Sequence, residues 1–203
     1  MKSSQTMPLQ DRMDHVFRLV TSSDFKAKRG LGNEVPFFIC PYSAEEAVEF
    51  KAAYQALLRR VETTGTSILE LDLYDITIEM CKERGIWDKI LEMEVSLSKD
   101  KLLETLRAVL DPENRLVPEI SKRMEAVGFD LMFLTGVGEV YPFIRSHTIL
   151  NNLQSAAKDK PTVLFFPGEY RQADDVGTSL DLFGKLRDDK YYRAFNIFNC
   201  DVG

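Results

Sequence analysis

The sequence contains few of the residues that build metal sites and disulfide frameworks. The 203-residue chain has 3 cysteines and 2 histidines. Cys40, Cys81 and Cys200 are widely spaced and odd in number, which predicts free thiols rather than disulfides. His15 and His147 lie far apart in the sequence, and no ligand spacing joins them to a cysteine, so we expect no metal site.

The sequence also lacks long apolar runs and an excess of positive charge. Its longest apolar runs, such as 131–134 and 163–166, are far too short to span a bilayer, and residues 1–8 contain no apolar signal-peptide core. We therefore expect no membrane segment and a cytoplasmic location. The net charge is −6, so we expect no strong direct binding to duplex DNA. The basic run at 26–29 is the one place that departs from this acidic balance.

Apolar strand patterns alternate with helical patterns along the chain. The apolar fraction of 44% and the charged fraction of 29% are typical of a globular protein. Strand patterns cover 37–40, 67–73, 129–134, 162–166 and 192–198, and helical patterns cover 9–20, 43–63, 76–127, 178–186 and a segment starting at 146. The alternation predicts an α/β fold with a central, mostly parallel sheet of four to five strands flanked by helices. We expect one domain over residues 1–203, with a helical insert around 76–127.

Local signals predict where the helices begin and end. Ser43 and Glu46 have the spacing of a capping box, and Ser146 can cap the helix that follows it. Proline fits the first turn of a helix, so Pro118 either kinks a helix or marks its start. Breaks within the insert are expected at Gly85, Ser98 and the Asp111-Pro112 pair.

The predicted plan is similar to a P-loop or Rossmann-like domain, but the phosphate-binding loop is missing. After the first strand, residues 41–46 read Pro-Tyr-Ser-Ala-Glu-Glu and contain neither glycine nor lysine. Residues 135–138 read Thr-Gly-Val-Gly, but Tyr141 stands where a dinucleotide motif needs its third glycine, so a tight turn is favoured. We therefore expect no nucleotide cofactor.

Two carboxylates on the second strand allow two interpretations. Glu70 and Asp72 are two residues apart, so they lie on one face of a strand. Such a pair can hold Mg²⁺ in a nuclease or phosphatase. The lysine that would accompany this chemistry is missing, which favours a solvated or helix-capping pair.

Two segments, 138–147 and 161–170, place polar groups beside the ends of predicted strands. The ends of parallel strands are where ligands and partners usually bind. His147 could act as a general base, but no residue is identifiable that would orient it, so a structural role is favoured. Arg145 and Arg171 could bracket one pocket, with Glu169 neutralising one of them, but an Arg–Glu pair near a glycine turn more often fixes a loop than binds a substrate. No complete catalytic set emerges, and we expect a protein without enzymatic activity.

These two segments, together with 35–42 and 192–197, resemble the BrxB family of BREX (bacteriophage exclusion) systems. The resemblance covers nearly the whole chain, and 138–147 and 161–170 are its specific part. It implies a small component of a phage-defence system that works beside a methyltransferase, a large ATPase and a PglZ-type phosphatase-like protein. The family provides no catalytic residues to transfer.

The sequence therefore favours a non-catalytic subunit or adaptor that binds another BREX protein, most plausibly the PglZ-type protein. No small-molecule substrate is identified. An alternative is a cryptic enzyme that acts on nucleotide or DNA phosphate through Arg145, His147 and Glu169. An adaptor predicts an exposed apolar or strand-edge patch, whereas the enzyme predicts a pocket where these three side chains meet. The residues expected to bind the partner are Tyr141, Phe143, Arg145, His147, Glu169 and Tyr170.

Overall fold

Five parallel strands form the centre of the molecule. The computed structural model describes residues 7–28, 36–173, 177–188 and 194–201. The strand order is β2-β3-β4-β1-β7, and every pairing along this path is parallel. This arrangement confirms the predicted α/β fold. The strand bounds are β1 Phe37–Tyr42, β2 Ile68–Asp72, β3 Leu131–Thr135, β4 Thr162–Ala173 and β7 Phe195–Asn196.

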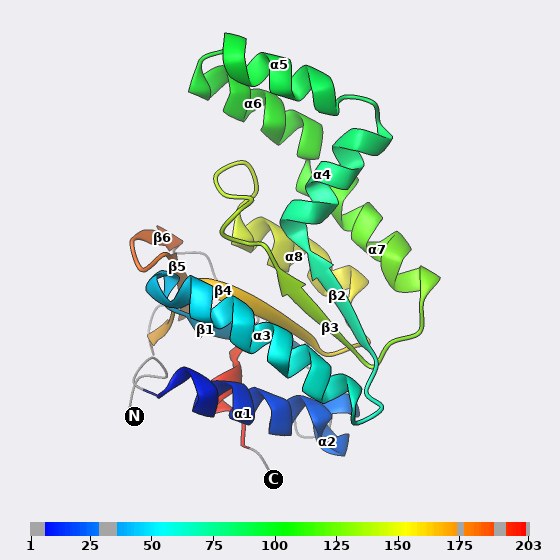
Figure 1. The fold of residues 1–203 in the computed structure, drawn as a ribbon, viewed down its shortest axis with the longest axis vertical. Helices are drawn as coiled ribbons and strands as arrows, with labels where there is room; N and C mark the ends of the chain where they lie inside the picture. The colour runs from blue at the N-terminus through cyan, green and yellow to red at the C-terminus, as the bar shows by residue number, and fades with distance from the viewer. Residues whose placement is uncertain (1–6, 29–35, 174–176, 189–193, 202–203) are drawn as a thin grey trace.

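Helices cover both faces of this sheet (Figure 1). The first face carries α1 (Leu9–Thr21), α2 (Ser23–Lys26) and α3 (Ala47–Glu62). The opposite face carries α7 (Val117–Ala126) and α8 (Ser146–Ala156). Strands β1 and β3 are covered on both sides, and nearly all of their residues are apolar, as expected for a buried parallel sheet.

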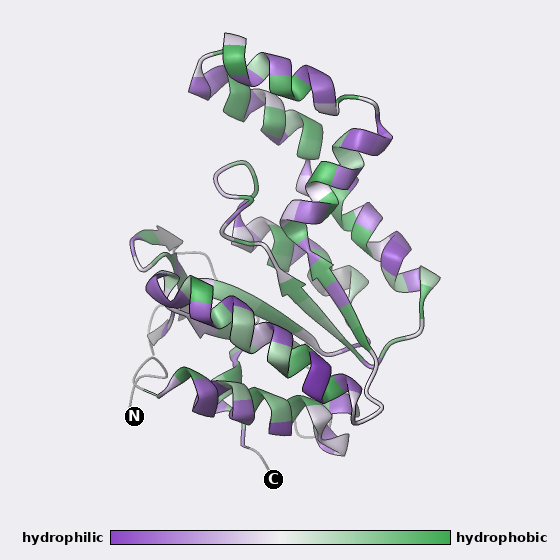
Figure 2. Ribbon diagram, in the orientation of Figure 1, coloured by the Kyte–Doolittle hydropathy of each residue, from purple (hydrophilic) through white to green (hydrophobic). Residues whose placement is uncertain are grey.

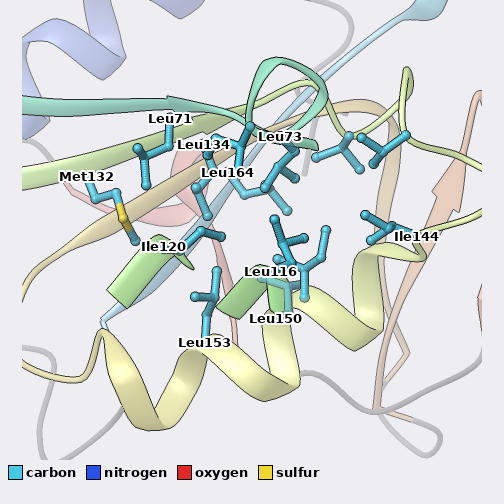
Figure 3. Packing of buried hydrophobic residues seen from close by; sticks show 14 of the residues in the cluster. Leu71, Leu73, Leu116, Ile120, Met132, Leu134, Ile144, Leu150, Leu153 and Leu164 are labelled. Atoms are coloured by element: carbon cyan, nitrogen blue, oxygen red, sulfur yellow. The ribbon is translucent and has the colours of Figure 1, made fainter. Parts of the chain in front are cut away.

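Successive strand residues enter two separate hydrophobic cores. In β1, Phe37 and Ile39 belong to the core beneath α8, whereas Phe38 and Cys40 belong to the core beneath α3. This alternation follows from the two-residue period of a strand. Figure 3 shows the first core, where strand residues meet side chains of η3 (Pro112–Leu116), α7 and α8. The labelled contacts include Leu134, Leu164, Leu116, Ile120, Leu150 and Leu153.

The helical insert lies between β2 and β3, as predicted. It comprises α4 (Leu73–Glu83), α5 (Trp87–Ser96), α6 (Lys99–Leu110), η3 and α7. The predicted breaks are confirmed: Gly85 adopts φ 64°, Ser98 caps α6 and Asp111 caps η3. Pro118 stands in the first turn of α7 and therefore marks its start. Helices α5 and α6 project away from the sheet (Figure 1), and Figure 2 shows apolar residues along both of them.

The helix predicted at 178–186 is wrong. Residues Gly177–Leu182 form β5 and Leu186–Asp188 form β6, and these two strands make an antiparallel hairpin on the end of β4. Phe183 and Gly184 adopt φ values of 56° and 67°, which close the turn between the strands. The strand conformation is selected by pairing with β4, a long-range contact that local helical spacing does not reveal.

Two predicted helix caps also differ in the structure. Ser43 accepts a hydrogen bond from the backbone N of Glu45, within the 3₁₀ turn η2 (Ala44–Glu46), and the Glu46 side chain binds Arg12 instead of closing a capping box. Ser146 is the first residue of α8 rather than its cap. For the strand predicted at 192–198, β7 covers two residues, and 192–193 lie outside the described residues.

Candidate functional site

The loop after β3 is packed against the body of the protein. Its apolar residues Val137, Val140 and Ile144 are buried, at 2%, 0% and 1% exposure. Gly136 adopts φ 77°, and a Cβ atom there would lie 2.5 Å from Oδ1 of Asp72. The loop thus needs glycine at this position, both for its backbone conformation and for its approach to α4. The predicted tight turn at 135–138 is confirmed.

Asp72 is a capping residue, as the sequence favoured. Its Oδ1 accepts hydrogen bonds from the backbone N atoms of Tyr74 and Asp75, at 2.9 and 3.1 Å. Its Oδ2 accepts a hydrogen bond of 2.9 Å from Oγ1 of Thr135. Asp72 therefore ties the start of α4 to the end of β3. Within the described residues, no group of three or more His, Cys, Asp and Glu side chains is placed to hold a metal ion.

The two segments singled out in the sequence meet in space. A Cβ atom at Gly138 would lie 3.0 Å from Cγ of Pro167 and 3.1 Å from Cε1 of Phe183. Gly168 is more tightly confined, because its Cβ would lie 2.2 Å from the backbone oxygen of Asp181. A backbone contact this close excludes a side chain at Gly168. The loop 136–145 and the β4–β5 hairpin therefore form one packed unit.

The residues expected to bind a partner occupy different environments within this unit. Tyr141 and Phe143 are half-buried and pack against the core, whereas Arg145 is exposed. His147 is buried at the start of α8, with 9% exposure. Tyr170 is half-buried, and its hydroxyl donates a hydrogen bond of 3.0 Å to the backbone oxygen of Ala194.

Of the two arginines that the sequence offered as partners of Glu169, Arg171 forms the ion pair. Oε2 of Glu169 lies 2.7 Å from Nη2 of Arg171, and Oδ2 of Asp181 lies 3.0 Å from Nε of the same guanidinium. These two carboxylates, Glu169 first, raise the pKa of Arg171. Glu169 lines a cavity with Ser43, Phe183 and Lys185, and this cavity includes neither Arg145 nor His147.

An apolar groove opens between the helices of the insert and the loop. It has a volume of about 150 Å³ and lies between α4, α5, α6 and Phe143. Nη2 of Arg107 on α6 donates a hydrogen bond of 3.3 Å to the backbone oxygen of Pro142, which holds the loop against the helices. The side chains that define the groove include Tyr74, Ile78, Trp87, Leu91, Leu106 and Phe143.

Sequence reasoning found Phe143 but missed the helical side of this groove. The signal was present as pairs of apolar residues four positions apart, Trp87 with Leu91 on α5 and Leu102 with Leu106 on α6. Such pairs lie on one face of a helix. In the sequence they are typical of core packing. Only the projection of α5 and α6 beyond the sheet leaves this face partly open (Figure 1).

The free thiols predicted from the sequence are present. Cys40, Cys81 and Cys200 are all free, and the first two are buried. In the described part of the chain, no helix combines the length and the apolar character that a membrane crossing requires.

Comparisons with known proteins agree with the resemblance seen in the sequence. A family model described as BREX protein BrxB matches residues 69–197. A BREX protein BrxB from Bacillus cereus (strain H3081.97) is 37% identical over 195 residues, which cover 94% of this chain and 98% of that protein. A BREX protein BrxB from Escherichia coli O9:H4 (strain HS) is 27% identical over 189 residues, covering 93% and 91% of the two chains. No solved structure matches this chain significantly. The chain belongs to the BrxB family of BREX proteins.

Proposed function

We propose that this chain is a binding subunit of a BREX phage-defence complex and that it does not catalyse a reaction itself. Its partner is another BREX subunit, with the PglZ-type protein as the first candidate. The observation that supports this function is the apolar groove between the helical insert and Phe143. A groove of this kind fits an adaptor better than it fits an enzyme acting on charged phosphates.

The groove has the chemistry of a protein-binding surface. Tyr74, Trp87 and Phe143 contribute aromatic side chains, the type enriched where binding energy concentrates. Tyr74 and Leu91 are 41% and 43% exposed, so a partner would remove apolar surface from water at its rim. We propose that an amphipathic helix of the partner places its apolar face in the groove.

The helices α5 and α6 give a second reason to expect a partner. Each buries one residue, Ile90 in α5 and Leu110 in α6. Val95 on α5 is 90% exposed. Amphipathic helices are stabilised mainly by packing of their apolar face, so a partner bound along α5 and α6 would also stabilise these two helices.

The six residues that the sequence predicts to bind the partner have different proposed roles, from direct contact to support of the loop. Phe143 lines the groove directly, and Tyr141 lies two residues before it in the same loop. Arg145 is exposed and close in sequence, which suits a residue at the rim of an interface. For His147, Glu169 and Tyr170, we propose a supporting role in holding the loop and the β4–β5 hairpin together.

Affinity capture of the tagged protein from cells that carry the intact BREX gene cluster tests this function. Leu91→Glu and Phe143→Ala should lower recovery of the partner, because each loses an apolar contact worth about 1–2 kcal/mol. Val48→Glu is the matched control, because Val48 is an 82% exposed apolar residue on α3, outside the groove. Circular dichroism establishes that each variant is folded.

The capture experiment has a clear contrary result. If Leu91→Glu and Phe143→Ala fold normally and recover every BREX subunit at the level of Val48→Glu, the groove is not the interface. Arg145→Glu extends the test to the rim. Hydrolysis of ATP or DNA by the pure protein, lost in His147→Ala, would favour an enzyme instead.

A further inference from the structure

A second cavity lies at the carboxyl ends of the parallel strands. It has a volume of about 280 Å³ and is lined by Tyr42 at the end of β1, Asp72 at the end of β2 and Thr135 at the end of β3. Helix α3 forms its other wall through Lys51 and Tyr54. In open parallel sheets, the crevice outside these strand ends is the usual place for a ligand.

The cavity is strongly acidic. Four carboxylates and one ammonium group line it, which gives a formal charge of −3. The ammonium group belongs to Lys51, and the carboxylates belong to Glu70, Asp72, Asp75 and Glu139. Asp72 is occupied by the cap described above, so the other three carboxylates provide the charge that a ligand would meet. A phosphate or another anion is therefore disfavoured.

A buried hydroxyl at this cavity, that of Tyr54, lies near the Glu70 carboxylate but forms no hydrogen bond of good geometry. Tyr54 is 4% exposed, and its hydroxyl is one of three buried polar side-chain groups without such a hydrogen bond in the described part of the chain. Leaving a buried hydroxyl without a hydrogen bond is unfavourable, so a ligand that supplies one gains affinity. Burial first, and then the nearby Glu70 carboxylate, raise the pKa of Tyr54. The hydroxyl therefore stays protonated and can accept a hydrogen bond from a ligand.

Aromatic rings form the remaining walls. Tyr42 stacks on Phe50 with ring centroids 3.7 Å apart, and Tyr54 meets Phe165 edge to face at 4.8 Å. All four residues line the cavity. Aromatic faces beside carboxylates attract flat organic cations, because the rings carry negative charge on their faces.

We propose that this cavity binds a guanidinium group. The group is positively charged, carries five N–H donors in a plane and stacks on aromatic faces, so it matches the carboxylates, the Tyr54 hydroxyl and the rings together. A bare metal ion fits less well, because no carboxylate cluster placed to hold one is found among the described residues. The guanidinium comes either from an arginine side chain of a protein partner or from a free small molecule.

This site is separate from the apolar groove. The residues that line the cavity and those that line the groove are different. The partner-binding role of the groove and the guanidinium-binding role of the cavity can therefore be tested and disproved separately. Loss of partner recovery through groove variants says nothing about guanidinium binding by the isolated protein.

Nuclear magnetic resonance titration of the full chain with N-acetylarginine methyl ester tests the site. The neutral analogue N-acetylcitrulline methyl ester is the control ligand, because it has nearly the same shape without the charge. We expect saturable shifts of the Gly136 amide and the Tyr54 ring with the arginine ligand, and at least tenfold weaker binding of the citrulline ligand, the loss expected for a charge-assisted hydrogen bond.

Substitutions make the test specific to the cavity. Glu70→Gln and Tyr54→Phe should each weaken binding by about tenfold, whereas Lys51→Met should strengthen it by removing the competing cation. Glu62→Gln is the matched control, because Glu62 is an exposed carboxylate of α3 that does not line the cavity. Binding that is absent, or equal for the two ligands, overturns the proposal. So does a Glu70→Gln effect equal to that of Glu62→Gln.

A second arm identifies the source of the guanidinium. In affinity capture from cells with the intact gene cluster, the Glu70→Lys variant should recover less of a BREX subunit than the wild type does, if that subunit provides the arginine. Unchanged recovery, together with arginine-ligand binding by the wild-type protein, assigns the site to a free small molecule.

Discussion

Arg12 and Glu46 form an ion pair across 34 residues of sequence, with Nη2 of Arg12 2.6 Å from Oε2 of Glu46. The Arg12 side chain is 1% exposed and the Glu46 side chain is 38% exposed. The pair joins α1 to η2, at the point where the chain leaves β1 for α3. Because Arg12 is buried, its charge needs compensation, and Glu46 is its carboxylate partner among the residues that the structure describes.

Loss of the Glu46 carboxylate should destabilise the protein more than loss of its neighbour. Glu46→Gln leaves the Arg12 charge buried and unpaired, and we expect the free energy of unfolding to fall by about 1–3 kcal/mol, less than for a fully buried pair because Glu46 is partly exposed. Glu45→Gln, on an exposed neighbour, should change it by less than about 0.5 kcal/mol. Urea unfolding of both variants measures the difference. Equal effects would show that the ion pair contributes little to stability.

Alanine substitutions at two glycines with left-handed backbones distinguish the stability cost of the backbone conformation from the cost of steric overlap. Gly136 and Gly85 have φ values of 77° and 64°. A Cβ atom at Gly85 meets no atom within 4 Å, whereas at Gly136 it meets Asp72 and the backbone of α4. Gly85→Ala should cost about 1–2 kcal/mol from the left-handed conformation alone, and Gly136→Ala should cost about 1–3 kcal/mol more from overpacking. Denaturant titration measures both, and similar losses would contradict the close approach of the β3 loop to Asp72.

Stability should decline at alkaline pH because of Cys40. Burial raises the pKa of its thiol to about 12, only partly offset by Arg12, while the unfolded thiol titrates near 9.0. Below pH 9 both states keep the proton, so Cys40 gives no pH dependence. As the pH rises from 9 toward 12, the unfolded state ionises first, and the free energy of unfolding falls by at most about 1.4 kcal/mol per pH unit.

The contribution of Cys40 can be isolated between pH 9 and 10. Burial also raises the pKa values of Tyr42 and Tyr54, but unfolded tyrosine titrates near 10.0, so these residues act mainly above this window. Cys40→Ala should therefore unfold with a shallower pH dependence than the wild type between pH 9 and 10. Unfolding free energies at half-unit steps measure the slope, and identical slopes would rule out the raised pKa.

Features that depend on neighbouring residues could be predicted from the sequence alone. Gly85, Ser98 and the Asp111-Pro112 pair ended or capped helices as predicted, because a helix end is set by the hydrogen bonds of one turn. Strands β1, β3 and the first part of β4 were also predictable, because a strand covered on both faces is apolar at nearly every position, and β2 was predictable from its alternation. Asp72 was correctly interpreted as a cap for the same local reason.

The pairing of distant segments depends on the fold. Residues 178–182 form a strand because β4 extends beyond its pairing with β1 and pairs with them, and β6 in turn pairs with β5. The Glu46 side chain pairs with the buried Arg12 instead of forming the predicted capping box with Ser43. Neither competitor is near in sequence, so local spacing could not reveal it.

The candidate sites, too, were only partly predictable from the sequence. The sequence pointed to the two segments around Gly138 and Pro167, which the fold brings into contact. It also singled out Phe143 and the Glu70–Asp72 pair, but not the groove and the acidic cavity that these residues line. The groove joins the consecutive helices α4, α5 and α6 to the distant Phe143, and the cavity joins α3 to the ends of three strands. Local patterns specify which elements form, but a concave surface exists only after those elements are packed, because its walls come from different parts of the chain.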